Sequence, residues 1–185
     1  MSTAMTKLVM RTEMAEALAS KYGLDVGSLM EVLSKTIMPN KTATSTQVMA
    51  LVVAAKQYDL NPLMGEIMAF PTKDGGIRPM VGLDGWAAIM NRHPMYDGME
   101  TEEIYDKDGH FIGVTCRIYR KDRNHPTVVT EYHIECKRDT EPWRKWPIRM
   151  TRGKAVIQCC RLAFGLSGIY EPDEELPQYR RIQLA

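Results

Sequence analysis

The sequence lacks the features that mark exported or membrane-bound proteins. No apolar run approaches the ~20 residues that a membrane-spanning helix needs, and the N-terminus has no basic-then-apolar signal peptide pattern. The 4 cysteines show neither CxxC spacing nor the spacing of a disulfide framework. These absences favour a protein of a reducing cytoplasm, with no membrane partner.

Motifs for catalysis and for metal binding are also absent. No GxxxxGK[ST] loop is present, which argues against an NTPase. His125, His133 and Cys136 lack a fourth ligand at zinc-site spacing. The acidic residues between 97 and 108 have no EF-hand register, so we interpret them as a solvated strand and turn or as a surface that faces a neighbouring subunit. We therefore predict no catalytic residues and no metal site, and a protein that is not an enzyme.

The net charge of +1 conceals a strong asymmetry along the chain. Residues 117–161 contain 12 Lys and Arg against 5 Asp and Glu, which is +7, and the rest of the chain carries −6. Concentrated basicity in a neutral chain is typical of a nucleic-acid groove, although internal salt bridges could produce the same pattern. Surfaces of opposite sign also favour head-to-tail self-association.

One long helix is expected from about Ile148 to Phe164. Its apolar residues cover more than half of the helical wheel, with Leu162 among them. The remaining narrow polar stripe has the spacing i, i+4, i+7 and consists of Lys154, Gln158 and Arg161. The pattern predicts a helix that is buried on most sides and leaves a cationic strip open to a ligand.

Two arginines at the start of this helix point to the kind of ligand. Arg149 and Arg152 lie in the first turn, where the helix dipole disfavours a cation by ~0.3–1 kcal/mol. A bound anion would offset that cost, because backbone N–H groups and guanidinium groups both suit phosphate oxygens. A solvated helix start with incidental charges is the alternative. Together with the cationic strip, the arginines favour a phosphate site.

Two β-hairpins precede the long helix. The first is expected from Glu66–Phe70 and Ile77–Val81, with Lys73 at its tip, and Asp84 is expected to cap the helix that follows. The second has the alternating run FIGVTCRIY and a return strand, Thr127 to Ile134. Its turn carries Lys121 and Arg123. These cations form either a hydrated loop or a second phosphate-contacting patch on the opposite wall of the groove.

The segment 137–147 joins this hairpin to the long helix and interleaves cations with two tryptophans. Such a pattern suits stacking on unpaired bases, worth roughly 1–3 kcal/mol per base. We nevertheless expect Trp143 and Trp146 each to serve mainly in packing.

The fold class expected is α+β in a single domain that spans residues 1–185. Helices occupy residues 1–62, among them one from Thr44 or Ser45 to Tyr58 with Met49, Val52 and Val53 on its buried side. Residues 63–170 form the core, in which β-hairpins build a small antiparallel sheet and the long basic helix packs across it. Residues 171–185 read as a tail.

Three segments of the sequence are similar to a known family. They are RMTRGKAVIQCCRLAFGLSGIYE, QYDLNPLMGEIMAFPTKDGGIRPMVGLDGW and TCRIYRKDRNHP, and together they span roughly residues 46–170. The chain thereby resembles the phage Bet family, the lambda Red beta type of single-strand annealing protein in the RecT/Red beta superfamily. The resemblance implies a Rad52-like β-β-β-α annealing core. The chain departs from the family pattern at two places. The connection around Thr140 is shorter, and Ile148 stands where a lysine is typical.

The resemblance also implies a function. It implies ATP-independent binding of single-stranded DNA, annealing of complementary strands through a duplex intermediate, and assembly into rings or helical filaments, with no cofactor and Mg²⁺ at most aiding pairing. The family's partners, a phage exonuclease and the host single-strand-binding protein, contact a C-terminal domain that we expect to have no counterpart before Ala185. A duplex-binding architectural protein and a metal-dependent nuclease are the alternatives.

The residues expected to contact DNA come from two sources. The resemblance carries over five basic positions, which are Lys73, Lys121, Arg149, Lys154 and Arg161. Their location adds three more, which are Arg123, Arg152 and Gln158.

Overall fold

The computed structural model describes residues 13, 15–37, 42–72, 75–167 and 169. Its elements in chain order are α2 (Val26–Thr36), α3 (Ser45–Gln57), η1 (Pro62–Met64), β1 (Ile67–Pro71), β2 (Ile77–Val81), α4 (Leu83–Arg92), β3 (Tyr96–Tyr105), β4 (Phe111–Arg120), β5 (Thr127–Tyr132), α5 (His133–Cys136), α6 (Glu141–Lys145) and α7 (Pro147–Phe164). The predicted α+β class is confirmed. Residues 15–21 add a further helical segment ahead of α2.

Local capping explains where the N-terminal helices begin. Asp25 caps α2 by accepting a hydrogen bond from the Ser28 backbone at 2.9 Å. Of the two predicted starts, Thr44 and Ser45, it is Thr44 that caps α3, through a reciprocal capping box with Gln47. The buried face of α3 consists of Val48, Leu51, Val52 and Ala55. The predicted Met49 and Val53 are only half-buried, because the face that meets the core is rotated by about one residue.

The first hairpin forms a sheet of its own. β1 pairs antiparallel with β2, with Ile67 opposite Val81. Lys73, the predicted DNA contact at the tip, lies outside the described residues. The helix α4 follows at once, but Asp84 does not cap it. Gly82 is the N-cap, without a side-chain hydrogen bond, and Asp84 lies inside the first turn. There its carboxylate stabilises the helix dipole rather than an orphan N–H group.

The second sheet has three antiparallel strands in the order β3-β4-β5. The central strand β4 buries Val114, Cys116 and Ile118 completely, in the alternation that its sequence predicted. The return strand is shorter than expected. It ends at Tyr132, because the chain turns there into α5, where the His133 ring meets the Thr151 hydroxyl of α7 at 3.0 Å. Ile134 is therefore helical.

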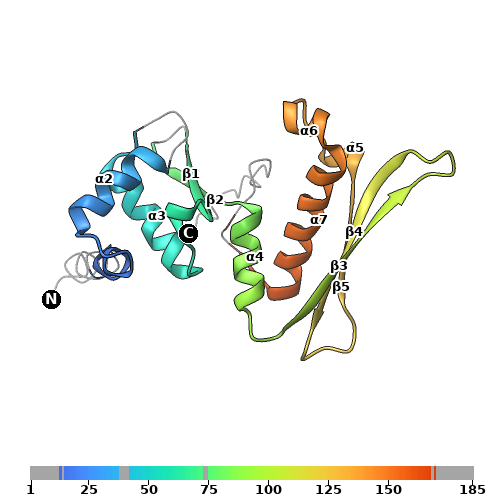
Figure 1. Ribbon diagram of the computed structural model, residues 1–185, viewed down its shortest axis with the longest axis horizontal. Coiled ribbons are helices and arrows are strands. Elements are labelled where there is room, and N and C mark those ends of the chain that lie inside the picture. The colour runs from blue at the N-terminus through green and yellow to red at the C-terminus, as the bar shows by residue number, and fades with distance from the viewer. Residues whose placement is uncertain (1–12, 14, 38–41, 73–74, 168, 170–185) are drawn as a thin grey trace, which may run out of the picture.

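The long helix lies across one face of this sheet, as predicted (Figure 1). Pro147 occupies its first turn and Gly165, in the left-handed region at φ 64°, ends it. The Cys159 thiol contacts the carbonyl oxygens of Cys116 and Thr127 at 3.5 and 3.3 Å, which ties the helix to β4 and β5. Leu162 departs from the predicted apolar arc. It is 65% exposed, because it lies at the edge of the helix face that packs on the sheet rather than within that face.

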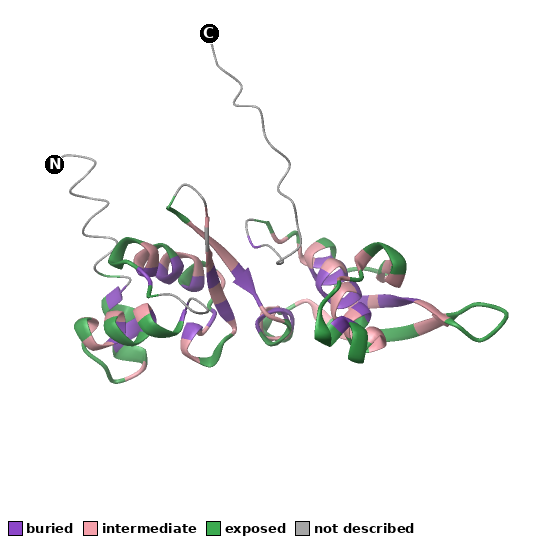
Figure 2. Ribbon diagram, turned by 90° about the horizontal axis from the view of Figure 1, so that it is seen from above, coloured by how far each residue is buried: buried purple, intermediate pink, exposed green. Residues whose placement is uncertain are grey.

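A continuous apolar core joins the elements that frame the site. It includes buried residues of α2 and α3, of the β1–β2 hairpin, of α4, of the three-stranded sheet and of α7. Figure 2 shows purple, buried stretches in both the helical part and the sheet part. The helix α4 lies beside α7, on the side of α7 that is away from the sheet. In the described part of the chain, no helix has the length and apolar character needed to cross a membrane.

Candidate nucleic-acid interface

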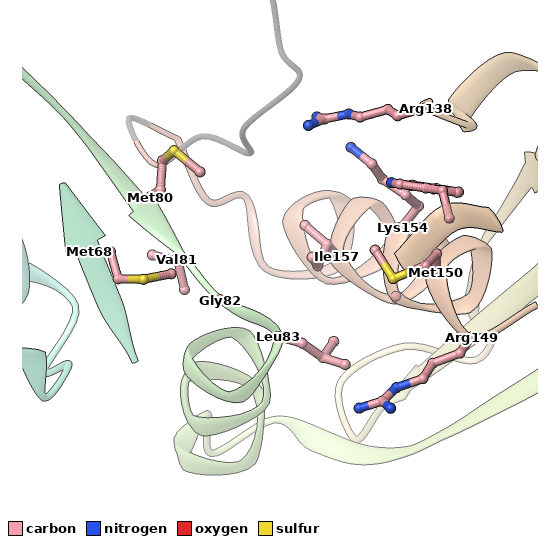
Figure 3. A pocket seen from close by; sticks show the side chains of 12 residues that line it. Met68, Met80, Val81, Gly82, Leu83, Arg138, Arg149, Met150, Lys154 and Ile157 are labelled. Atoms are coloured by element: carbon pink, nitrogen blue, oxygen red, sulfur yellow. The ribbon is translucent and has the colours of Figure 1, made fainter. Parts of the chain in front are cut away.

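A cavity of about 340 Å³ opens between the first hairpin and α7 (Figure 3). One wall comes from β1, β2 and the start of α4, and the other from α7 and the segment before it. The residues that line the cavity are Met68, Met80, Val81, Gly82, Leu83, Arg138, Trp143, Arg149, Met150, Gly153, Lys154 and Ile157. Its surface is thus mostly apolar, and its charged lining residues are all cations.

The three cations stand on the same wall. Figure 3 shows Arg138 and Lys154 extending from the α7 side toward the hairpin, while Arg149 reaches toward Leu83. Cations gathered around a space of this kind repel one another unless an anion lies between them. The arrangement suits a polyanion that runs past the opening more than a small neutral ligand.

The local sequence explains why α7 begins with free donors. Trp146 is both the C-cap of α6 and the N-cap of α7, and its side chain makes no capping hydrogen bond. The first turn of α7 contains no acidic residue. Its N–H groups therefore keep the partial positive charge of a helix start, next to the Arg149 guanidinium. This end of the helix suits a phosphate beside Arg149, and the binding of one there stays a prediction.

The polar stripe continues from the cavity along α7. Lys154, Gln158 and Arg161 are half-buried, whereas Val156, Cys159 and Ala163 on the opposite side are buried against the sheet. The stripe predicted from the sequence thus lies on the outward side of the helix. From Lys154 to Arg161 it covers ~11 Å at 1.5 Å per residue.

Arg152 lies on a different side of α7. Its guanidinium donates to the Glu103 carboxylate of β3 at 2.5 Å. The Tyr105 hydroxyl donates to the same carboxylate at 2.6 Å, and these hydrogen bonds, with that from Tyr105 the larger cause, lower the pKa of Glu103. Arg152 therefore does not line the cavity with Arg149 and Lys154. Its assignment as a DNA contact stays a prediction.

The turn between β4 and β5 stands at the other end of α7. Arg120, at the end of β4, donates to the Ala163 carbonyl in the last turn of the helix and lies over the Phe164 ring at 5.4 Å. Lys121 and Arg123 follow in the turn and are exposed. They do not line the cavity, whose opposite wall comes from β1, β2 and α4. Contact of Lys121 and Arg123 with DNA stays a prediction.

Sequence reasoning missed Arg138 and the apolar wall. Arg138 lies between α5 and α6, and only the folding of these two short helices brings it beside Lys154. The available signal was the density of basic residues in 137–147. Met68 and Met80 line the cavity from paired positions of β1 and β2. Val81, which follows Met80, lines it as well, so strand alternation alone did not indicate this wall.

The two tryptophans of this region differ sharply. Trp143 is 5% exposed and its ring lies 6.0 Å from that of His133, so its predicted packing role is confirmed. Burial lowers the pKa of His133, with Lys137 adding to the effect. Trp146 is 45% exposed and is therefore not the packing residue that we expected. Spacing along the chain did not distinguish the two.

One group of side chains in the described ranges has the geometry of metal ligands. Asp106, Asp108 and His110 offer ligand atoms within 4.8 Å of one another at the tip of the β3–β4 hairpin, and all three are exposed. Hydrogen bonds within the turn explain this clustering. The Asp106 carboxylate accepts from the Asp108 and His110 backbones at 2.9 and 2.8 Å. A nuclease would need paired carboxylates beside the phosphate that it cleaves. These three residues do not line the cavity beside α7.

Comparison with known proteins now identifies the lineage. Residues 25–184 match the model of the RecT family. The chain belongs to the RecT family. It is also 45% identical, over 187 aligned residues, to the recombination protein bet of Escherichia phage lambda, an alignment that covers 94% of this chain and 67% of that protein. Both findings confirm the family resemblance seen in the sequence.

Proposed function

We propose that this RecT-family protein binds single-stranded DNA along the outward side of α7 and anneals complementary strands without ATP. The observation that carries the proposal is the cationic track itself. Arg138, Arg149 and Lys154 line one wall of the cavity, and Gln158 and Arg161 continue from Lys154 along one side of α7. Membership in a family that includes a phage recombination protein supports it.

The physical role of such a track is to remove two obstacles to annealing. Complementary strands repel each other through their phosphates, and each free strand collapses into local pairings. A groove that neutralises one backbone reduces the repulsion and holds that strand extended. Watson–Crick pairing then supplies the selectivity, so that contacts to phosphates suffice and the protein need not read base identity.

The rest of the function follows from this chemistry. Because pairing of the strands releases the free energy that drives the step, we propose that the protein has no catalytic residue and uses no ATP or other cofactor, with Mg²⁺ at most aiding pairing. We also propose a homo-oligomer, a ring or helical filament, since successive grooves must align for pairing to propagate. A phage exonuclease and the host single-strand-binding protein remain predicted partners.

The decisive experiment mixes complementary oligonucleotides that carry a donor and an acceptor dye, with and without ATP and Mg²⁺. We expect the protein to accelerate pairing equally with and without ATP. Cleavage of either strand would support a nuclease instead, and binding of preformed duplex without acceleration would support an architectural protein. Lys154→Ala should slow the reaction. Lys35→Ala is the matched control, because Lys35 is an exposed lysine of α2 in an ion pair with Glu31 and does not line the cavity.

A further inference from the structure

Trp146 differs from the other two tryptophans of the chain in its exposure to solvent. Trp86 is fully buried and Trp143 is 5% exposed, whereas 45% of Trp146 is accessible. A large aromatic side chain that is left in water gives up the stabilisation of ~1.5–3 kcal/mol that burial of a large apolar side chain contributes. The exposed part of the Trp146 ring is therefore accessible to a ligand, and its neighbours decide whether it suits one.

The backbone holds this residue rigidly. The Trp146 N–H donates to the Pro142 carbonyl at 2.8 Å, and its own carbonyl accepts from the Met150 N–H at 3.0 Å. It thereby ends α6 and begins α7, and Pro147 fixes the next φ angle. Because the Cα position is set by two helices at once, the ring projects from a fixed point. A rigid aromatic ring loses little conformational entropy when a ligand stacks on it.

Two cations flank the ring. The Lys145 Nζ atom lies 4.8 Å from the centre of the Trp146 ring, and the Arg149 Cζ atom lies 6.0 Å from it. Arg149 also lines the cavity between the hairpin and α7. The exposed ring thus stands at the N-terminal end of the cationic track, between two groups that can each take a phosphate.

The free energies of the two kinds of contact decide whether a base can replace these cations on the Trp146 ring. At an exposed site a cation–π contact is worth only about 0.5–1 kcal/mol. Stacking of a nucleobase on an aromatic side chain is worth roughly 1–3 kcal/mol. A base can therefore displace either cation from the ring with a net gain. The displaced cation stays close enough to bind the phosphate next to that base.

From these contacts we propose that Trp146 is a base-stacking platform, on which one nucleobase of the bound single strand rests while Lys145 and Arg149 hold the flanking phosphates. This inference rests on the proposed function. The proposed contact is to the face of a base, and every nucleotide has such a face. Stacking on Trp146 therefore adds no sequence preference. It also sets the register of the strand at the point where the strand enters the track.

The test compares normal and abasic oligonucleotides of the same length. Trp146→Ala should weaken binding of a mixed-sequence single strand by about 5- to 150-fold, the equivalent of one lost stacking contact. Trp146→Phe should keep much of the affinity. On an oligonucleotide of abasic residues, the parent and Trp146→Ala should bind equally. Tyr132→Ala removes another aromatic residue of 45% exposure from β5 and is the matched control, with no loss on either ligand.

Fluorescence provides a second readout that does not depend on the stability of the alanine variant. Mixed-sequence DNA should quench the emission of the parent, and Trp146→Phe should remove most of the quenching, because Trp86 is fully buried and Trp143, which lines the cavity, is only 5% exposed. Equal losses on normal and abasic strands, or quenching that is undiminished in Trp146→Phe, would overturn the stacking proposal. If the stacking proposal fails but the parent still anneals complementary strands, the proposed function stands. If the parent binds no single-stranded DNA at all, both the stacking proposal and the proposed function are refuted.

Discussion

Arg152 and Glu103 are joined across 49 positions of sequence, by a hydrogen bond from the guanidinium in the first turns of α7 to the carboxylate in β3. This ion pair connects α7 to β3, which is an edge strand of the three-stranded sheet. It also places a negative charge close to the start of the proposed DNA track. Glu102, the neighbouring residue, points to the other face of β3 and pairs with Arg117 at 2.9 Å. Adjacent glutamates therefore serve opposite faces of the same sheet.

We predict that Glu103→Gln strengthens binding of single-stranded DNA at low salt. The change removes a carboxylate that repels phosphates and releases Arg152 from its ion pair, so an increase of roughly two- to fivefold in affinity is expected, the effect of a single partly exposed charge pair. The gain should shrink as salt is raised. Anisotropy titrations of a labelled oligonucleotide measure it. Glu102→Gln is the control on the far face and should change the affinity little; an equal gain in both variants would contradict the role of Arg152.

A second prediction concerns the number of phosphate contacts. Each lysine or arginine that neutralises a phosphate contributes about 0.7 to the slope of log K against log salt for single strands. Lys154→Ala and Arg161→Ala should each reduce the parent slope by about that amount, and the double change by about twice as much. Titrations at four or more salt concentrations give the slopes. Weaker binding with an unchanged slope would mean that these side chains act on the fold and not on the backbone of the DNA.

The parts of this fold that the sequence predicted are those governed by local periodicity. The helix from 148 to 164 and the alternation of Val114, Cys116 and Ile118 both follow from side-chain spacing, because burial repeats every 3.6 residues in a helix and every second residue in a strand. The capping of α3 by Thr44 was equally local. These features need no knowledge of the rest of the chain.

The errors arise where distant segments decide the outcome. The burial of Trp143 and the exposure of Trp146 depend on how α6 packs beside His133, which spacing does not reveal. The pairing of Arg152 with Glu103 joins residues from separate elements. Arg138 reached the cavity only through the turn that α5 and α6 impose. For the site, the sequence therefore predicted the long helix and its polar stripe, but not which cations share a cavity.

A third prediction concerns acid stability. The Arg120 guanidinium donates two hydrogen bonds to Asp122, at 2.8 and 2.7 Å, and these lower the pKa of that carboxyl group to about 2. An unfolded Asp has a pKa of ~3.9. Because the folded pKa is the lower of the two, the stabilisation is fully present above pH ~4 and is lost as the pH falls through about 2. The parent should therefore exceed Asp122→Asn in melting temperature at pH 6, and the difference should shrink as the pH falls below 4 and vanish only below about pH 2. A difference that does not change with pH would refute the ion pair as its cause.

The last prediction compares two glycines that lie in helices. At Gly153 in α7, an added Cβ atom would meet nothing within 4 Å, so Gly153→Ala should gain the ~0.5–1 kcal/mol by which Ala exceeds Gly inside a helix. At Gly85 in α4, the same atom would lie 2.1 Å from the Glu66 carbonyl oxygen and 2.6 Å from a Val81 methyl group. Since α4 would have to move off the hairpin, Gly85→Ala should destabilise the protein by ~1–3 kcal/mol or more. Urea unfolding of both variants measures the two effects, which have opposite signs. If Gly85→Ala were as stable as the parent, α4 could not pack against the β1–β2 hairpin as closely as described. The position of Gly82 and Leu83 in the wall of the cavity would then be wrong as well, because both lie at the start of α4.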